Sequence, residues 1–154
     1  MMSPPELLDL LRVETAIIHL VVPRAEMPKV FGPAVQELFD VLARQGVESI
    51  GPVFAHHLAM PPGMFDFDLG VAVASPVAPE GRVKPGALPA GRVARTTYTG
   101  PYEGLHAAWS AFDGWLVENG LHKAANLWEV YGYGPDKTTD PATYRTELYR
   151  PLRG

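Results

Sequence analysis

The chain has 154 residues, of which 47% are hydrophobic and 19% are charged, and its formal net charge at pH 7 is -4. This length and composition predict a single globular domain over residues 1–154, and the scattered lysines and arginines argue against direct nucleic-acid binding. The chain contains no cysteine, which excludes disulfides, thiolate metal sites and thiol catalysis. No stretch reaches the roughly 18 apolar residues of a membrane span, so we expect a cytoplasmic protein without a membrane partner.

The first part of the chain predicts a strand followed by a helix. Residues 15–22, TAIIHLVV, are rich in β-branched side chains and stop at a proline, which is typical of a buried strand. The prolines of PRAEMPKVFGP predict a loop. Residues 34–45, AVQELFDVLARQ, place apolar side chains three and four positions apart before Gly46, and this pattern predicts an amphipathic helix. For the preceding PPELLDLLRVE we expect no more than a helical turn.

The middle of the chain predicts a hairpin, a loop and a further strand. Residues 52–60, PVFAHHLAM, and residues 65–75, FDFDLGVAVAS, are separated by PPG, as in two strands of a hairpin. Residues 76–91, PVAPEGRVKPGALPAG, are rich in proline and glycine and predict a long loop. Residues 91–100, GRVARTTYTG, predict the next strand.

The last part predicts a second helix and two strands. Residues 101–120, PYEGLHAAWSAFDGWLVENG, open on a proline and close on a glycine, in the positions that helix ends favour. Their apolar side chains form one helical stripe, made of Leu105, Ala108, Trp109, Phe112 and Leu116. Residues 126–134, NLWEVYGYG, and residues 144–152, YRTELYRPL, predict two strands joined by a loop.

The order of predicted elements repeats. Each half runs strand, helix, strand, strand, and FGPAVQEL and TGPYEGL each place Gly-Pro before a helix, 68 residues apart. One such unit cannot bury its sheet alone, so we predict an α+β fold of two duplicated modules, about residues 15–75 and 88–152. A pseudo-twofold axis would relate the modules, and their antiparallel sheet would enclose a central ligand cleft. The alternative is that Gly-Pro recurs only because helices often begin that way.

Glu129 lies in the middle of an aromatic strand. Because side chains alternate, it shares a face with Tyr131 and Tyr133, while Trp128 and Val130 point the other way. We expect the face of Glu129 to line the cleft and the other face to pack on the helices. A carboxylate in such an apolar cleft should have a raised pKa, and it would serve either as counter-charge to a lipophilic cation or as a general base with the Tyr131 hydroxyl. The alternative places Glu129 on a solvated sheet edge.

Three further residues are candidates for a ligand site, each with a structural alternative. Glu147 alternates with basic and aromatic neighbours in the last strand, so it lines the cleft or forms an ion pair. Asp68 shares a strand face with Asp66 and either lines the first module's side of the cleft or faces solvent. Trp109 belongs to the helical stripe and either packs in the core or presents its ring to the cleft.

The histidines do not predict a metal site. His56 and His57 are adjacent in a strand and therefore point to opposite faces, and His19, His106 and His122 show no ligand spacing. The GYGPDK segment lacks the glycine pattern of a phosphate loop or of a dinucleotide site. We therefore expect neither a metal nor another cofactor.

Three segments, YTGPYEGLHAAWSAFDGWLVENG, LWEVYGYGP and YRTELYRPL, resemble the C-terminal half of the gyrase-inhibitor-like (GyrI-like) effector-binding domain. The same domain forms the C-terminal part of AraC-type and MerR-type drug-responsive regulators. The similarity extends from about Thr15 to Leu152, and LPAGRVARTTYTGPYEGL and WEVY carry it most specifically. It implies two strand-helix-strand-strand modules, with Glu129 as the pocket carboxylate that meets cationic aromatic ligands and Tyr131 beside it.

The resemblance implies a stand-alone protein that binds small amphipathic molecules, either cationic or polyaromatic xenobiotics. Some free-standing members are similar to hydrolases that open strained cyclopropane rings, where Glu129 and Tyr131 would be catalytic and Trp109 or Tyr98 would shape the pocket. A third hypothesis is an inhibitor that contacts a partner protein directly. Only about 14 residues precede the first predicted strand, so we expect no DNA-binding domain in this chain, and a separate regulator stays open as a partner.

Overall fold

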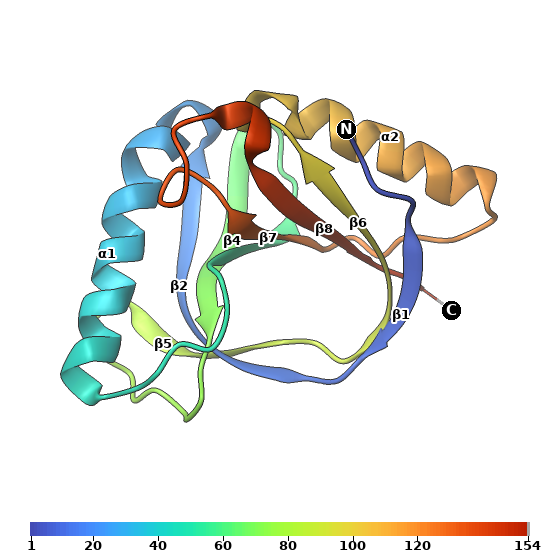
Figure 1. Cartoon of the computed structure of the whole chain (residues 1–154). Coiled ribbons are helices and arrows are strands. Elements are labelled where there is room, and N and C mark those ends of the chain that lie inside the picture. Colours follow the sequence, from blue (N-terminus) through green and yellow to red (C-terminus); the bar gives the residue numbers. More distant parts are fainter. Residues whose placement is uncertain (154) are drawn as a thin grey trace. The chain divides into compact units, whose positions relative to one another are not determined.

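The computed structural model describes residues 1–153. The chain folds into two compact units. Unit 1 contains Met1–Leu10 and the chain from Gly91 onward, and unit 2 contains Leu11–Ala90. Each unit combines one long helix with antiparallel strands, as Figure 1 shows. The structure is therefore α+β, as predicted.

Unit 2 contains four strands in the order β3-β4-β2-β5 and the helix α1. The strands are β2 (Val13–Pro23), β3 (Phe54–Ala59), β4 (Met64–Ala72) and β5 (Val83–Leu88). All three strand pairings are antiparallel. The helix α1 (Met27–Gln45) buries four apolar residues, Ala34, Leu38, Val41 and Leu42.

Unit 1 contains four strands in the order β1-β6-β8-β7 and the helix α2. The strands are β1 (Glu6–Leu10), β6 (Gly91–Thr99), β7 (Leu127–Tyr133) and β8 (Arg145–Pro151). Their pairings are also antiparallel. The helix α2 (Leu105–Glu118) follows β6 in the chain and buries one side of its surface against this sheet.

The two units repeat one arrangement of elements. Unit 2 runs β2, α1, β3, β4 and unit 1 runs β6, α2, β7, β8. In each unit the last of these strands, β4 or β8, lies between the other two. The remaining strands, β5 and β1, pair with β2 and β6 respectively. This confirms the predicted duplication, while the cleft between the modules stays a prediction. Within the described residues, no helix has both the length and the apolarity needed to cross a membrane.

Two strands were missed by the sequence prediction. The PPELLDLLRVE segment forms β1, not a helical turn, and Leu8 pairs with Val93 of β6. The predicted loop 76–91 contains β5, which pairs with β2 although it includes Pro85 and Gly86. Both strands have a hydrogen-bonded partner on one side within their unit, and a proline is tolerated in a strand at such an edge. Each segment forms a strand because a neighbouring strand offers unpaired backbone groups. The local sequence of neither segment reveals that neighbour.

Helix α1 begins at Met27, seven residues before the predicted start. The loop predicted for PRAEMPKVFGP is therefore wrong, since a 3-10 helix (Arg24–Glu26) leads directly into α1. The Gly32-Pro33 pair lies inside the helix instead of before it. Pro28 falls in the first turn, where its missing N–H needs no helical partner. Pro33 removes a backbone hydrogen bond, but burial of the apolar face that follows outweighs this loss.

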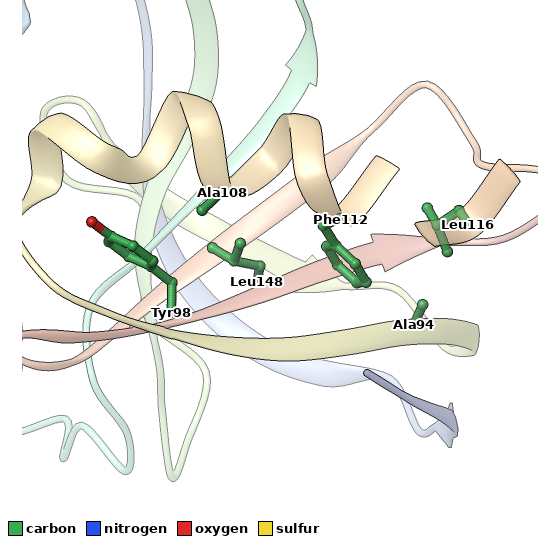
Figure 2. Close-up of a cluster of buried hydrophobic side chains, with 6 residues drawn as sticks. All are labelled: Ala94, Tyr98, Ala108, Phe112, Leu116 and Leu148. Atoms are coloured by element: carbon green, nitrogen blue, oxygen red, sulfur yellow. The ribbon is translucent and has the colours of Figure 1, made fainter. Parts of the chain in front are cut away.

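The core of unit 1 lies between α2 and the sheet. Figure 2 shows Ala108, Phe112 and Leu116 pointing from α2 toward the strands. Their partners in the buried cluster are Ala94 and Tyr98 of β6 and Leu148 of β8. Phe112 and Leu148 are completely buried, so the helical stripe predicted from sequence is the stripe that packs.

Candidate functional site

Strand β7 places Glu129 on the helix-covered face of the unit 1 sheet. Its cross-strand partner is Leu148, which lies in the core beneath α2. Tyr131 shares this face, and Trp128 points the other way, where its ring stacks on Tyr149. The predicted alternation is confirmed, but the prediction that Glu129 faces away from the helices is wrong. The reason is a partner on α2 that the strand sequence alone does not reveal.

That partner is Trp109, and Glu129 accepts two hydrogen bonds from aromatic side chains. The Trp109 Nε1–H donates to Oε2 of Glu129 over 2.7 Å, and the Tyr131 hydroxyl donates to Oε1 over 2.8 Å. Glu129 is only 8% exposed. The alternative of a solvated sheet edge is thereby excluded, and the carboxylate is buried with its oxygens paired.

Further aromatic rings lie next to the two donors, Trp109 and Tyr131. The ring of Tyr102 meets Tyr131 edge to face at 5.9 Å between centroids and lies 5.0 Å from the ring of Tyr144. The ring of Phe112 lies 5.8 Å from that of Trp109. Tyr102 and Tyr144 were not predicted from the sequence because both lie in turns next to regular elements. Tyr102 lies in a 3-10 helix (Tyr102–Gly104) and Tyr144 lies just before β8.

Arg150 of β8 completes the cluster and was also missed. Its guanidinium carbon lies 5.2 Å from the centre of the Trp109 ring. Nη2 lies 3.2 Å from each carboxylate oxygen of Asp113, and Nη1 donates to the carbonyls of Ala124 and Asn126 over 3.3 and 3.5 Å. Arg150 is 6% exposed, so a buried guanidinium, paired with the partly exposed Asp113, lies next to the Trp109 ring.

Burial determines the electrostatics of this site. Loss of hydration raises the pKa of Glu129 above its ordinary value, and the hydrogen bonds from Trp109 and Tyr131 oppose that rise only in part. Burial and the neighbouring Glu129 raise the pKa of Tyr131 well above its ordinary value, so its hydroxyl stays a donor at neutral pH. Burial also raises the pKa of Tyr102. The site is a carboxylate surrounded by neutral aromatic donors.

The family model for the GyrI-like small molecule binding domain matches residues 4–153. The chain belongs to this family. None of the curated protein sequences matches the chain. The match confirms the family inferred from the TGPYEGL and WEVY segments and covers both units.

Solved structures share the fold of this GyrI-like domain. The C-terminal domain of EcmrR has a TM-score of 0.86 and 21% identity, with 97% of each chain covered. SAV2435 bound to tetraphenylphosphonium has a TM-score of 0.72 and 13% identity, covering 99% of this chain and 95% of that one. A hydrolase from Listeria innocua has a TM-score of 0.70 and 13% identity, with 97% and 91% covered. The chain spans 57% of the EcmrR chain in its DNA complex.

Two other residues predicted for the site of this GyrI-like domain have other partners. The Tyr98 hydroxyl donates to the carbonyl of Pro101 over 2.8 Å, which ties the end of β6 to the start of the next turn. Glu147 lies on the opposite face from Glu129, since it pairs in register with Val130. It lies 3.6 Å from Nη1 of Arg95, which is the ion pair that the sequence analysis gave as the alternative. The structure thus joins only Trp109 and Tyr131 to Glu129 by hydrogen bonds among the described residues.

Asp68 belongs to unit 2 of the GyrI-like domain and binds His19. The His19 Nδ1 lies 2.8 Å from Asp68 and its Nε2 lies 3.2 Å from Asp66, so both carboxylates share one strand face as predicted. His56 and His57 pair in register with Asp68 and Phe67 and point to opposite faces. Within the described residues, no three histidine or acidic side chains are grouped as metal ligands.

The raised pKa of Glu129 predicts a pH dependence of the stability of the GyrI-like domain. Its contribution is fully present below the unfolded-state pKa near 4.5 and is lost as pH rises through the higher folded-state pKa. The melting temperature of the wild type should therefore fall, relative to that of Glu129→Gln, as the pH rises above the unfolded-state pKa. Differential scanning calorimetry of both proteins across this pH range measures the difference.

The titration of His57 does not affect the comparison of the two proteins. Burial lowers the pKa of His57 to about 4, so its contribution is lost as pH falls below the unfolded-state value of 6.5. Both proteins contain His57, and its effect cancels in their difference. Parallel curves of melting temperature against pH would show that Glu129 does not titrate with a raised pKa.

Proposed function

We propose that this GyrI-like domain binds lipophilic cations that carry aromatic rings, with Glu129 as their counter-charge. The observation that carries the proposal is a carboxylate that is 8% exposed and whose two hydrogen-bond donors are both aromatic side chains. An ionised carboxylate in such surroundings is costly unless a positive charge compensates it. A lipophilic cation supplies that charge without bringing its own tightly held water.

The rings around Glu129 add a second source of affinity for the same ligand class. Tyr102, Tyr131, Tyr144 and Trp109 are linked by ring contacts or by the shared carboxylate. Each contact between a cation and a ring face contributes about 0.5–2 kcal/mol, and ligand rings stack on the same side chains. An anion of equal size would gain the stacking and lose the charge interaction.

A ligand reaches Glu129 only if an aromatic side chain moves, because the carboxylate is buried. Trp109 and Tyr102 are both half-buried, and each borders solvent on one side. Each carboxylate oxygen accepts one hydrogen bond and keeps a second lone pair. A cation without hydrogen-bond donors therefore needs proximity to the carboxylate and does not have to replace the bonds from both rings.

SAV2435, which shares the fold, has been solved bound to tetraphenylphosphonium. This ion is a suitable probe because tetraphenylborate matches its size and shape and carries the opposite charge. Glu129→Gln is the matching variant, since its amide accepts from Trp109 and donates to the Tyr131 oxygen, so the packing is kept while the charge is lost.

We expect the wild type to bind tetraphenylphosphonium and not tetraphenylborate in isothermal titration calorimetry. Glu129→Gln should weaken tetraphenylphosphonium binding by about tenfold or more, since a charge contact in a low-dielectric site exceeds about 1.4 kcal/mol. Asp9→Asn, the same change at an exposed position of β1 in the same unit, should bind like the wild type. Equal binding of both ions, or unchanged affinity in Glu129→Gln, would reject the proposal.

One observation favours a second candidate, hydrolysis of a strained ring at the same site. The Tyr131 hydroxyl and Glu129 are 2.8 Å apart, which suits a base that activates water beside a hydroxyl donor. Incubation with a cyclopropane-containing alkylating compound should then yield a product heavier by one water, detected by mass spectrometry. Both Glu129→Gln and Tyr131→Phe should suppress that product, and an unchanged yield in either would remove the residue from catalysis.

A further inference from the structure

We propose that Arg150 is a positioning residue of the cation site, and that its guanidinium holds the Trp109 indole where the indole N–H donates to Glu129. The effect of Arg150 on ligand binding rests on the proposed function. The geometry that supports the inference belongs to unit 1 alone and is present without a ligand.

The first support is that one guanidinium contacts two successive turns of α2. Trp109 and Asp113 are four residues apart in α2, so their side chains lie on the same helix face. Arg150 lies over the ring of Trp109 at 5.2 Å and bonds both oxygens of Asp113 at 3.2 Å. Arg150 of β8 thus fixes the part of α2 that carries the Trp109 indole.

The second support is that Arg150 is itself held firmly. It is 6% exposed, and Nη1 donates to the carbonyls of Ala124 and Asn126 in addition to the bonds with Asp113. Asp113 in turn bonds Nζ of Lys123 at 3.0 Å. A planar guanidinium can stack on a ring and bond a carboxylate at the same time, which an ammonium group cannot do.

The third support is the balance of charge. Asp113 compensates Arg150, so the guanidinium orients Trp109 without neutralising Glu129, which accepts its hydrogen bonds from the neutral side chains of Trp109 and Tyr131. The negative charge of Glu129 stays available to a cationic ligand. Because the guanidinium covers one face of the Trp109 ring, the ligand would meet the other face or the edge.

The test measures Glu129 directly and needs no ligand. Domain labelled with 13C at the glutamate side-chain carboxyl is titrated by NMR, and the Glu129 signal is the one missing from Glu129→Gln. Trp109→Phe removes the N–H donor and should raise the titration midpoint of Glu129 by about one pH unit, since a hydrogen bond to a charged group is lost. Arg150→Met combined with Asp113→Asn should raise the midpoint in the same direction.

The paired change is chosen because it removes one positive and one negative charge together. It leaves no unpaired buried charge, and the net charge near Glu129 stays the same. If Arg150 acts through Trp109, adding Trp109→Phe to the pair should produce no further shift, because the donor is already misplaced. A wild-type midpoint in the paired variant, or shifts that add in the triple variant, would overturn the inference.

Arg150→Lys keeps the test decisive if the paired variant does not fold. Lysine retains the charge but not the planar stacking, so the midpoint should again rise, and an unchanged midpoint would overturn the inference. Tetraphenylphosphonium titrations on the same samples separate the two proposals. If the wild type binds no cation while the midpoints shift as described, the proposed function fails and the positioning role of Arg150 stands.

Discussion

Phe112→Ala should lower the free energy of unfolding by about 3–5 kcal/mol, the usual cost of replacing a buried aromatic ring with alanine. Phe112 is completely buried at the centre of the unit 1 core in Figure 2, between residues of α2, β6 and β8. Its ring lies 5.8 Å from that of Trp109 and 6.5 Å from that of Trp115. Urea denaturation followed by circular dichroism measures the loss.

The matched control for this prediction lies on the exposed side of the same helix. Val117 is 77% exposed, so Val117→Ala should change stability by no more than about 0.5 kcal/mol. A loss below about 1 kcal/mol in Phe112→Ala would contradict the packing described for α2. Because Phe112 supports Trp109, the variant should also weaken tetraphenylphosphonium binding under conditions in which it is still folded.

Gly104→Ala should lower the free energy of unfolding by about 1–3 kcal/mol, through overpacking and the loss of a hydrogen bond. A Cβ atom at Gly104 would lie 2.0 Å from the Tyr98 hydroxyl oxygen. That hydroxyl is bonded to the carbonyl of Pro101, and the ring of Tyr98 is packed in the core. The ring therefore cannot give way without loosening the connection between β6 and α2.

Two further variants make this prediction specific. Gly114→Ala changes a glycine of α2 that has no atom within 4 Å of an added Cβ, so it should be neutral or stabilising by up to about 1 kcal/mol. Tyr98→Phe removes the hydroxyl and should recover part of the loss when combined with Gly104→Ala. If Gly104→Ala and Gly114→Ala are equally stable in urea, contact with Tyr98 is not what requires glycine.

The TGPYEGL segment illustrates why a motif recognised in sequence has several physical causes. Gly100 has a φ of 149°, which favours glycine, and Gly104 leaves room for the Tyr98 hydroxyl. Tyr102 contributes a ring next to Tyr131. In the sequence the segment indicates a helix start and a family resemblance, whereas the separate roles of Gly100, Tyr102 and Gly104 depend on contacts in the folded chain.

Local periodicity was enough to predict several features of this chain. The alternation of β7 placed Glu129 and Tyr131 on one face, and the three- and four-residue spacing in α2 identified the stripe that contains Phe112 and Leu116. The repeated order of elements predicted the duplicated α+β fold. These inferences succeeded because strand and helix periods are properties of consecutive residues.

The partners that those faces meet depend on the packing of distant elements. Trp109 and Arg150 lie 20 and 21 residues from Glu129 along the chain, on α2 and β8, and neither contact follows from a local pattern. The strands β1 and β5 likewise formed because a neighbouring strand offered unpaired backbone groups, against the preference suggested by their own residues. Contacts between distant segments depend on how elements pack, so the environment that makes Glu129 a buried carboxylate with aromatic partners emerged only from the fold.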